Sequence, residues 1–237
     1  MIIKSAYYSV LRADTKNILR DSSLILMLFV PFIFIPLIRF GGRAIIDYFP
    51  EVTEYVSMCV ILLGATVAIF PAFVMGFVMM DEKDGGVNQV LRVLPFSLNK
   101  LIGLRVLSMT LVGFFNSLLF FALNGLMSFG VVEMIFLSIN TSLFAPITAF
   151  LMLCLSSNKI EAAAVLKGIS FVTFFAFLQF FIPSGYKYFL SAIPSFWVYR
   201  SFEVMSVGWQ FALFTTIGIV QQAIYIAILW KFFLKRW

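Results

Sequence analysis

The sequence contains no histidine, and only two of its 237 residues are cysteine. Histidine is the commonest general base and a common zinc ligand, so its absence removes both roles. Cys59 and Cys154 lie in separate apolar runs, without the spacing of a metal site or a disulfide, and we expect them to act as small apolar side chains. The motifs G-x-S-x-G, H-E-x-x-H and G-x-x-x-x-G-K-[ST] are also absent. We therefore expect this chain to contain no catalytic residue and to bind no metal, nucleotide or other cofactor.

Charged residues are scarce too, at 12% of the chain against roughly 25% in soluble domains. Hydrophobic residues make up 62%, and the mean hydropathy is +1.03. Runs of about 20 apolar residues match a hydrocarbon layer of ~30 Å, in which only helices and closed barrels satisfy their backbone polar groups. The alternating strands of a barrel are missing. The sequence predicts an all-α membrane protein with six transmembrane helices, at about 23–40, 56–80, 101–127, 131–155, 162–182 and 211–233.

Acidic residues are absent from the middle of these spans, because all eleven fall between the spans or at their ends. Enzymes that work inside the membrane, and carriers driven by protons or sodium, need buried charged groups of this kind. The sequence therefore disfavours both classes. Two function classes remain: a transport subunit whose energy comes from another polypeptide, or a membrane scaffold or assembly protein that transports nothing.

Lysine and arginine are distributed unevenly between the two sides of the predicted membrane. Thirteen of the 17 lie on the side of both termini and of the segments after spans two and four. An excess of positive charge marks the cytoplasmic side, so we expect both termini in the cytoplasm and the chain in the cytoplasmic membrane of a prokaryote. The net charge of +6 then reflects topology and attraction to anionic lipids. No nucleic-acid partner is expected.

We expect one transmembrane domain, residues 1–237, with three short segments outside the spans. Residues 1–22 place Lys4, Arg12, Lys16 and Arg20 between apolar residues, which predicts an amphipathic helix at the inner interface. It could be a basic anchor or a surface for a cytoplasmic partner. Residues 184–210 are rich in aromatic residues but too short to span, which suits a re-entrant or interfacial segment. They form either an aromatic belt or an outer gate, and the candidate gate residues are Pro194, Trp197 and Tyr199.

Polar residues deep in the predicted spans have two readings. Interhelical hydrogen bonds explain most such residues. Contact with a transported substrate is the alternative, and the candidates are Asn116, Asn140, Gln179 and Gln221. The second span also carries one small residue per turn on a single face, which permits close helix packing within the chain or between two copies: Gly64, Ala68, Ala72 and Gly76.

Residues 81–100 form the most polar segment of the chain. Acidic residues and the pair Gly85-Gly86 permit a sharp turn at the cytoplasmic face. Apolar residues then recur at helical spacing, which predicts a short amphipathic helix: Val87, Val90, Leu91 and Leu94. Pro95 ends this helix. Since a helix of two turns is unstable alone, we expect it to dock on the inner leaflet or on a partner protein.

The order of these segments resembles that of ABC-2 permeases, the transmembrane subunits of type-2 ABC exporters. The matching stretches are Glu82-Lys83-Asp84-Gly85-Gly86, "VNQVLRVLP", "SLNKLIGLRVL", "SSNKIEAAAVLKG" and "IPSFWVY". The chain is most similar to small drug- and peptide-export permeases, because the large extracellular domain of some members is missing.

The resemblance implies that residues 81–94 form a coupling helix seated in a separate ATPase subunit. The implied coupling residues are Glu82, Lys83, Gly85, Gly86, Val87, Val90, Leu91 and Leu94. Two permeases, identical or mixed, and two ATPase subunits would form the complex, with ATP and magnesium bound by the ATPase. The implied cargo is amphipathic or hydrophobic: a drug, a peptide or a lipid.

Overall fold

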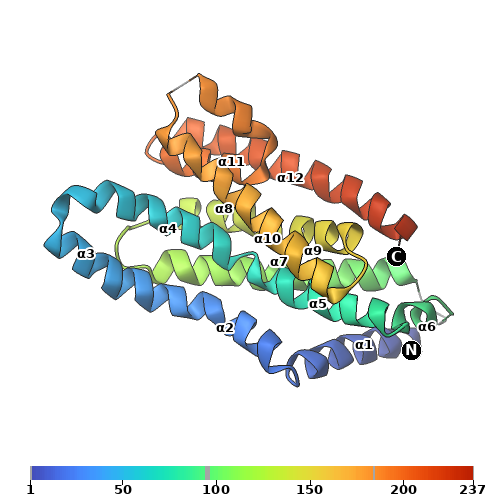
Figure 1. Ribbon diagram of the computed structural model, residues 1–237. Helices are drawn as coiled ribbons and strands as arrows, with labels where there is room; N and C mark the ends of the chain where they lie inside the picture. The colour runs from blue at the N-terminus through green and yellow to red at the C-terminus, as the bar shows by residue number, and fades with distance from the viewer. Residues whose placement is uncertain (1, 94–96, 184, 237) are drawn as a thin grey trace.

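The computed structural model describes residues 2–93, 97–183 and 185–236, which form a bundle of helices with both termini at the same end (Figure 1). No strand occurs in these residues. Six helical segments are long and apolar enough to cross a membrane: Ser22–Tyr48, Pro50–Asp84, Leu98–Leu123, Val131–Leu155, Lys159–Phe181 and Gly208–Lys235. The predicted all-α, six-span, multi-pass membrane protein is therefore confirmed.

The first span is longer than its apolar run. It begins at α2 (Ser22–Pro36), passes through a π-helical turn (η1, Leu37–Gly42) and continues as α3 (Arg43–Tyr48). The π turn follows Pro36 directly, and such turns are a common response to a disturbed hydrogen-bond ladder. The sequence predicted a first span that ends near residue 40, but the helix continues past the end of the apolar run to Tyr48.

The second and fourth spans each consist of two helices with a break near a proline. α4 (Thr53–Val67) is followed by α5 (Phe70–Asp84), and Pro71 lies in the first turn of α5. α8 (Val131–Ser142) is followed by α9 (Phe144–Leu155), in which Pro146 occupies the first turn. Proline fits a first turn because the N–H it lacks has no partner there.

These two broken spans form the centre of the bundle. Two thirds (67%) of the apolar window of each is buried, against 33% or less for the other spans. The small residues of the second span are all buried within this chain, and a side chain added at Gly76 would collide with Met152 of α9. The structure thus uses this face for packing inside the chain.

The remaining spans surround this centre. They are α7 (Leu98–Leu123), α10 (Lys159–Phe175) with its continuation η3 (Ala176–Phe181), and α12 (Gly208–Arg236). One apolar core lies at the end that carries the termini, and a second core with many aromatic side chains lies at the opposite end.

The helices α1, α6, η4 and α11 lie outside the spans. α1 (Ile2–Ile18) lies beside the end of α5, next to α6 (Val87–Val93), at the end of the bundle that we call the α6 end (Figure 1). At the opposite end, η4 (Tyr186–Ala192) and α11 (Pro194–Glu203) fold back between α10 and α12. No residue of α11 from Pro194 to Phe202 is exposed, and its re-entrant character stays a prediction.

Candidate functional site

The polar segment at the end of α5 is held on two sides by its own chain. All four consecutive side chains from Asp81 to Asp84 make an ion pair or a hydrogen bond. Glu82 faces α1 and α7, while the other three face the turn between α9 and α10. The segment that the sequence singled out is therefore fixed at the junction of five helices.

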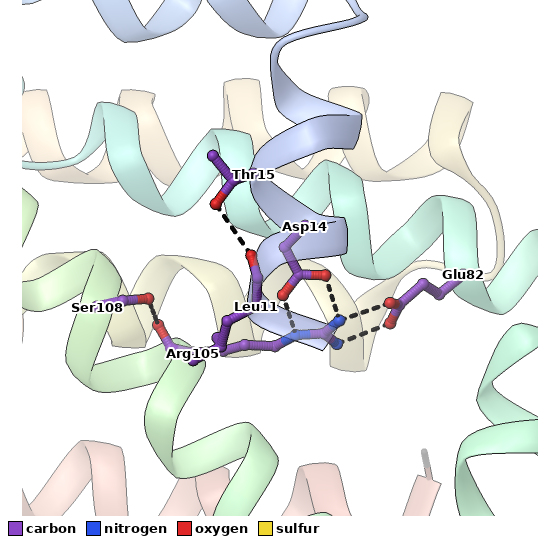
Figure 2. A network of polar contacts seen from close by, with 6 residues as sticks. All are labelled: Leu11, Asp14, Thr15, Glu82, Arg105 and Ser108. Atoms are coloured by element: carbon purple, nitrogen blue, oxygen red, sulfur yellow. Dashed lines mark hydrogen bonds and ion pairs between the residues drawn. The ribbon is translucent and has the colours of Figure 1, made fainter. Parts of the chain in front are cut away.

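Arg105 of α7 lies at the centre of a buried ion network (Figure 2). Its guanidinium donates to Asp14 of α1 through Nε (2.9 Å) and Nη2 (2.7 Å), and to Glu82 of α5 through Nη1 (2.7 Å) and Nη2 (2.5 Å). Arg105 is only 1% exposed. Because a planar guanidinium bound by two bidentate carboxylates has one favourable geometry, this network fixes α1, α5 and α7 relative to one another.

A second, more exposed set of contacts joins α5 to the start of α10. The Nζ of Lys159 lies 2.8 Å from Asp81, and its backbone N–H donates to Asp84 at 3.1 Å. The Nζ of Lys83 donates to the carbonyl oxygen of Ser156, at the end of α9, at 2.9 Å. These exposed ion pairs contribute little stability. They do fix the direction in which the chain leaves α5.

Lys159 also lies 3.9 Å from Asp21, which caps α2 by accepting from the backbone N–H groups of Ser23 and Leu24. Desolvation tends to raise the pKa of Asp21, but these N–H groups and the charge of Lys159 outweigh it and lower the pKa. The entry to the first span is thus held by a carboxylate that is charged at neutral pH.

The turn into α6 depends on Gly86, whose φ of 71° lies in the left-handed region. Glycine adopts that conformation without steric cost, and it reverses the chain directly after α5. The apolar residues of α6 then separate into two groups. Leu91 is buried on the inner side, whereas Val87, Val90 and Val93 are exposed. Leu94, the fourth predicted apolar position, lies outside the described residues.

A pocket of about 460 Å³ lies between α1, α5 and α6. Val10, Leu24 and Leu91 line its apolar part, and Asp14 and Glu82 lie at its edge. Asp14 and Glu82 bind Arg105, and the two other carboxylates of the lining, Asp21 and Asp81, lie near Lys159. All four are therefore paired within the chain. No group of three or more metal-ligating side chains occurs in the part of the chain that the structure describes.

Three of the four polar candidates for a substrate path are hydrogen-bonded to other segments of the chain. Asn140 of α8 accepts from the side-chain amide of Gln222 of α12, and Gln179 of η3 donates to the carbonyl oxygen of Phe196. Gln221 donates to the carbonyl oxygen of Ser191 at 2.7 Å. Interhelical hydrogen bonds thus account for part of their polarity. Each of the three, and also Asn116 of α7, retains one buried polar atom without a partner among the described residues.

The three candidates for an outer gate belong to α11. Pro194 begins the helix, Trp197 donates from its indole N–H to the carbonyl oxygen of Ser191 at 3.0 Å, and Tyr199 is fully buried. The ring of Tyr199 packs against Phe177 of η3 edge to face. The structure therefore places these residues in the aromatic core rather than in a belt at the surface. Their role as a gate stays a prediction.

Sequence reasoning missed Asp14, Arg105 and Lys159 as members of the site. One signal was available, since Arg105 lies about one turn inside the span predicted at 101–127, and an ionisable residue inside a span needs a partner. The identity of that partner could not be read from the sequence, because Asp14 is 91 residues away.

The fold and these contacts define a class: a helical membrane protein with six candidate spans and no metal-binding cluster in its described part. A model of the family described as "Fluoroquinolones export permease protein Rv2686c-like" matches residues 14–230, and the chain belongs to that family.

Two curated relatives come from strains of Mycobacterium tuberculosis. They are named "Fluoroquinolones export permease protein MT2760" (strain CDC 1551 / Oshkosh) and "Fluoroquinolones export permease protein Rv2686c" (strain ATCC 25618 / H37Rv). Each is 24% identical to this chain over 241 residues, which cover 94% of this chain and 90% of the relative. No solved structure matches.

Proposed function

We propose that this chain is the membrane subunit of an ABC-2-type exporter driven by a separate ATPase subunit. Three observations support the proposal: the order of the ABC-2-like segments, the membership of an export-permease family, and the absence of a phosphate-binding motif from the sequence. ATP and magnesium would then bind to the partner, and this chain would not be an enzyme.

The α6 end faces the cytoplasm in this proposal. Both termini lie there (Figure 1), as an even number of spans requires. The excess of lysine and arginine in the segments at this end supports the same orientation. The membrane would be the cytoplasmic membrane of a prokaryotic cell.

The observation that carries the proposal is the contrast between the end of α5 and α6. Every side chain from Asp81 to Asp84 is bound within the chain, whereas the next helix leaves three valines exposed at an end that we place in water. We propose that the ATPase holds α6 by Val87, Val90 and Val93. Glu82 and Lys83 would then not touch the ATPase themselves. They would transmit its movement to α7 and to the turn before α10.

Movement of α6 would reach the membrane through α5. This helix runs unbroken from Phe70 to Asp84 and packs against α9, so it moves as a rigid body. Its other end meets the break at Ala68 and Ile69, where a change in backbone angle separates α5 from α4. Such a break is a suitable hinge between the driven half of the span and the outer half.

The complex would contain two membrane subunits and two ATPase subunits. α10 belongs to the span with the smallest buried share of its apolar window, 11% against 17% or more for the others. We place the second membrane subunit against it. Cargo would pass between the two subunits, with Asn116 and Asn140 as candidate polar contacts. Small amphipathic drugs are the proposed cargo, and fluoroquinolones are the first to test because the relatives are named for them.

The test is the substitution Val90→Asp. Val90 is 57% exposed, so a carboxylate there should leave the fold intact and place an unpaired charge in the proposed interface. Burying such a charge is costly, and we expect at least tenfold weaker association with the ATPase and a similar loss of drug export.

The matched control is Val131→Asp, an equally apolar and exposed site in the first turn of α8 at the opposite end. Co-purification with the ATPase subunit and drug accumulation in cells are measured for both variants. Normal association and export in the Val90 variant, or equal losses in both, would contradict the proposal.

A further inference from the structure

A row of basic side chains runs along the outer side of α1 and the turn that follows it. Arg12, Lys16 and Arg20 follow one another at intervals of four residues, and all three are exposed. None of them makes an ion pair or a hydrogen bond in the described part of the chain. Four-residue spacing places Arg12 and Lys16 on one face of α1, and Arg20, in the turn after the helix, lines the same surface hollow. This surface therefore offers three positive charges that no carboxylate in the described part of the chain neutralises.

An apolar groove of about 360 Å³ lies directly beside this row. Its walls come from four helices and the turn after α1. The lining residues include Leu11 of α1, Leu19 of the turn, Leu28 of α2, Met75 of α5, and Met109 and Val112 of α7. The few polar groups at its edge are already satisfied. The hydroxyl groups of Thr15 and Ser108 donate to the carbonyl oxygens of Leu11 and Arg105, and Asp14 binds Arg105 (Figure 2).

The basic row and the groove adjoin each other, because Leu11 and Thr15 each precede a basic residue by one position, about 100° around the helix. The groove also has depth. Its far residues, Pro71 on α5 and Val112 on α7, lie about 20 Å along their helices from the α6 end, at 1.5 Å per residue. A hydrocarbon layer is about 30 Å thick, so the groove reaches from the headgroup level to near its middle.

We propose that this groove binds one anionic phospholipid. Its phosphate would lie on Arg12, Lys16 and Arg20, and one acyl chain would fill the groove between α2 and α7. Basic pockets between transmembrane helices bind anionic headgroups in this way. A zwitterionic lipid could place an acyl chain in the groove but would gain little from the three positive charges. A protein partner could bind the charges but would leave the groove empty. The side-by-side arrangement of the two favours an anionic lipid.

The position of the site gives the lipid a second effect, which rests on the proposed function. α1 carries Asp14, which holds Arg105 and, through it, Glu82 of the coupling segment. A lipid that holds α1 in place would therefore keep this ion network assembled. Binding itself is measured on the chain alone, so its outcome does not depend on whether an ATPase partner exists.

The test is native mass spectrometry of the purified full chain in neutral detergent, titrated with phosphatidylglycerol and with phosphatidylcholine of identical acyl chains. Three basic side chains near an anionic group contribute roughly fivefold each to its binding. We therefore expect phosphatidylglycerol to bind on the order of 100-fold more tightly than phosphatidylcholine. In the triple variant R12Q/K16Q/R20Q, both lipids should bind about equally.

Two further variants make the result decisive. K100Q/K231Q/K235Q removes three exposed charges at the same end but away from the groove, and it should keep the preference. Val112→Trp fills the groove and should weaken both lipids at least tenfold without changing their ratio.

Equal binding of the two lipids to the unmodified chain would overturn the proposal, as would the same loss in both triple variants. Unchanged binding in Val112→Trp would reveal surface attraction without a groove. A change of oligomeric state in R12Q/K16Q/R20Q, with lipid binding retained, would identify a protein interface instead.

Discussion

The substitution Arg105→Met tests whether the ion network of Figure 2 holds α1 against the bundle. It removes all four hydrogen bonds of the guanidinium and leaves Asp14 and Glu82 facing each other with side chains only 4% and 11% exposed. Removing one partner of a buried ion pair costs about 3–5 kcal/mol, because the remaining charge is buried without compensation. We therefore expect a destabilisation of that size.

Replacing all three members should have a different effect. Apolar side chains of similar volume in place of a buried ion triad are often neutral or stabilising, since the desolvation of three charges is avoided. The variant D14L/E82L/R105M should therefore recover most of the stability that Arg105→Met loses. This contrast separates a buried network from an exposed one, in which the single change would cost about 1 kcal/mol or less.

The assay is thermal unfolding of the purified chain in detergent. For domains of 150–250 residues, 1 kcal/mol corresponds to about 2–4 °C, so Arg105→Met should lower the Tm by about 6–20 °C. Lys100→Met, which removes an exposed charge from the same helix, is the control and should change it little. A Tm for Arg105→Met close to that of the control, or a triple variant no more stable than the single one, would refute the reasoning.

Two smaller predictions concern packing and capping. A side chain added at Gly113 of α7 would lie 2.7 Å from the backbone carbonyl oxygen of Ala68, so Gly113→Ala should cost about 1–3 kcal/mol by thermal unfolding, whereas Gly168→Ala, which meets nothing, should not. Asp21→Ala removes the cap of α2 and should cost about 1 kcal/mol at pH 7. Because the folded-state pKa of Asp21 is lowered, the stability that Asp21 contributes is present above about pH 4 and is lost as the pH falls further. The unmodified chain and Asp21→Ala should therefore be equally stable in acid. A difference in stability that persists in acid would contradict the role of Asp21 as a charged cap.

The spans could be predicted from the sequence because a bilayer imposes one requirement, a run of about 20 apolar residues. The breaks near Pro71 and Pro146 were predictable only in part, since proline suits the first turn of a helix but Pro31 lies within α2 without ending it. The extension of the first span to Tyr48 was not, because those residues lie beyond the apolar run.

The contacts at the α6 end could not be predicted, because they depend on which helices meet. Arg105 is a charged residue within an apolar span. Its two carboxylate partners are brought to it only by the packing of α1 against α5 and α7. The spacing within residues 87–94 predicted a helix with an apolar face, but Val90 and Leu91 both belong to that face. The structure shows that Leu91 packs inward while Val90 is exposed. Packing within the chain decides which apolar residues of α6 are buried, and the spacing of residues in the sequence does not show it.

The most direct test of the central claim is a photo-cross-linking amino acid at Val93, which is 81% exposed on α6. The matched control is the same group at Tyr48, which is also 81% exposed but lies at the opposite end. In cells, the account predicts a cross-link from position 93 to an ATPase subunit, and none from position 48. A position 93 that labels from outside the cell, or that cross-links only to lipid while drug export continues, would contradict it.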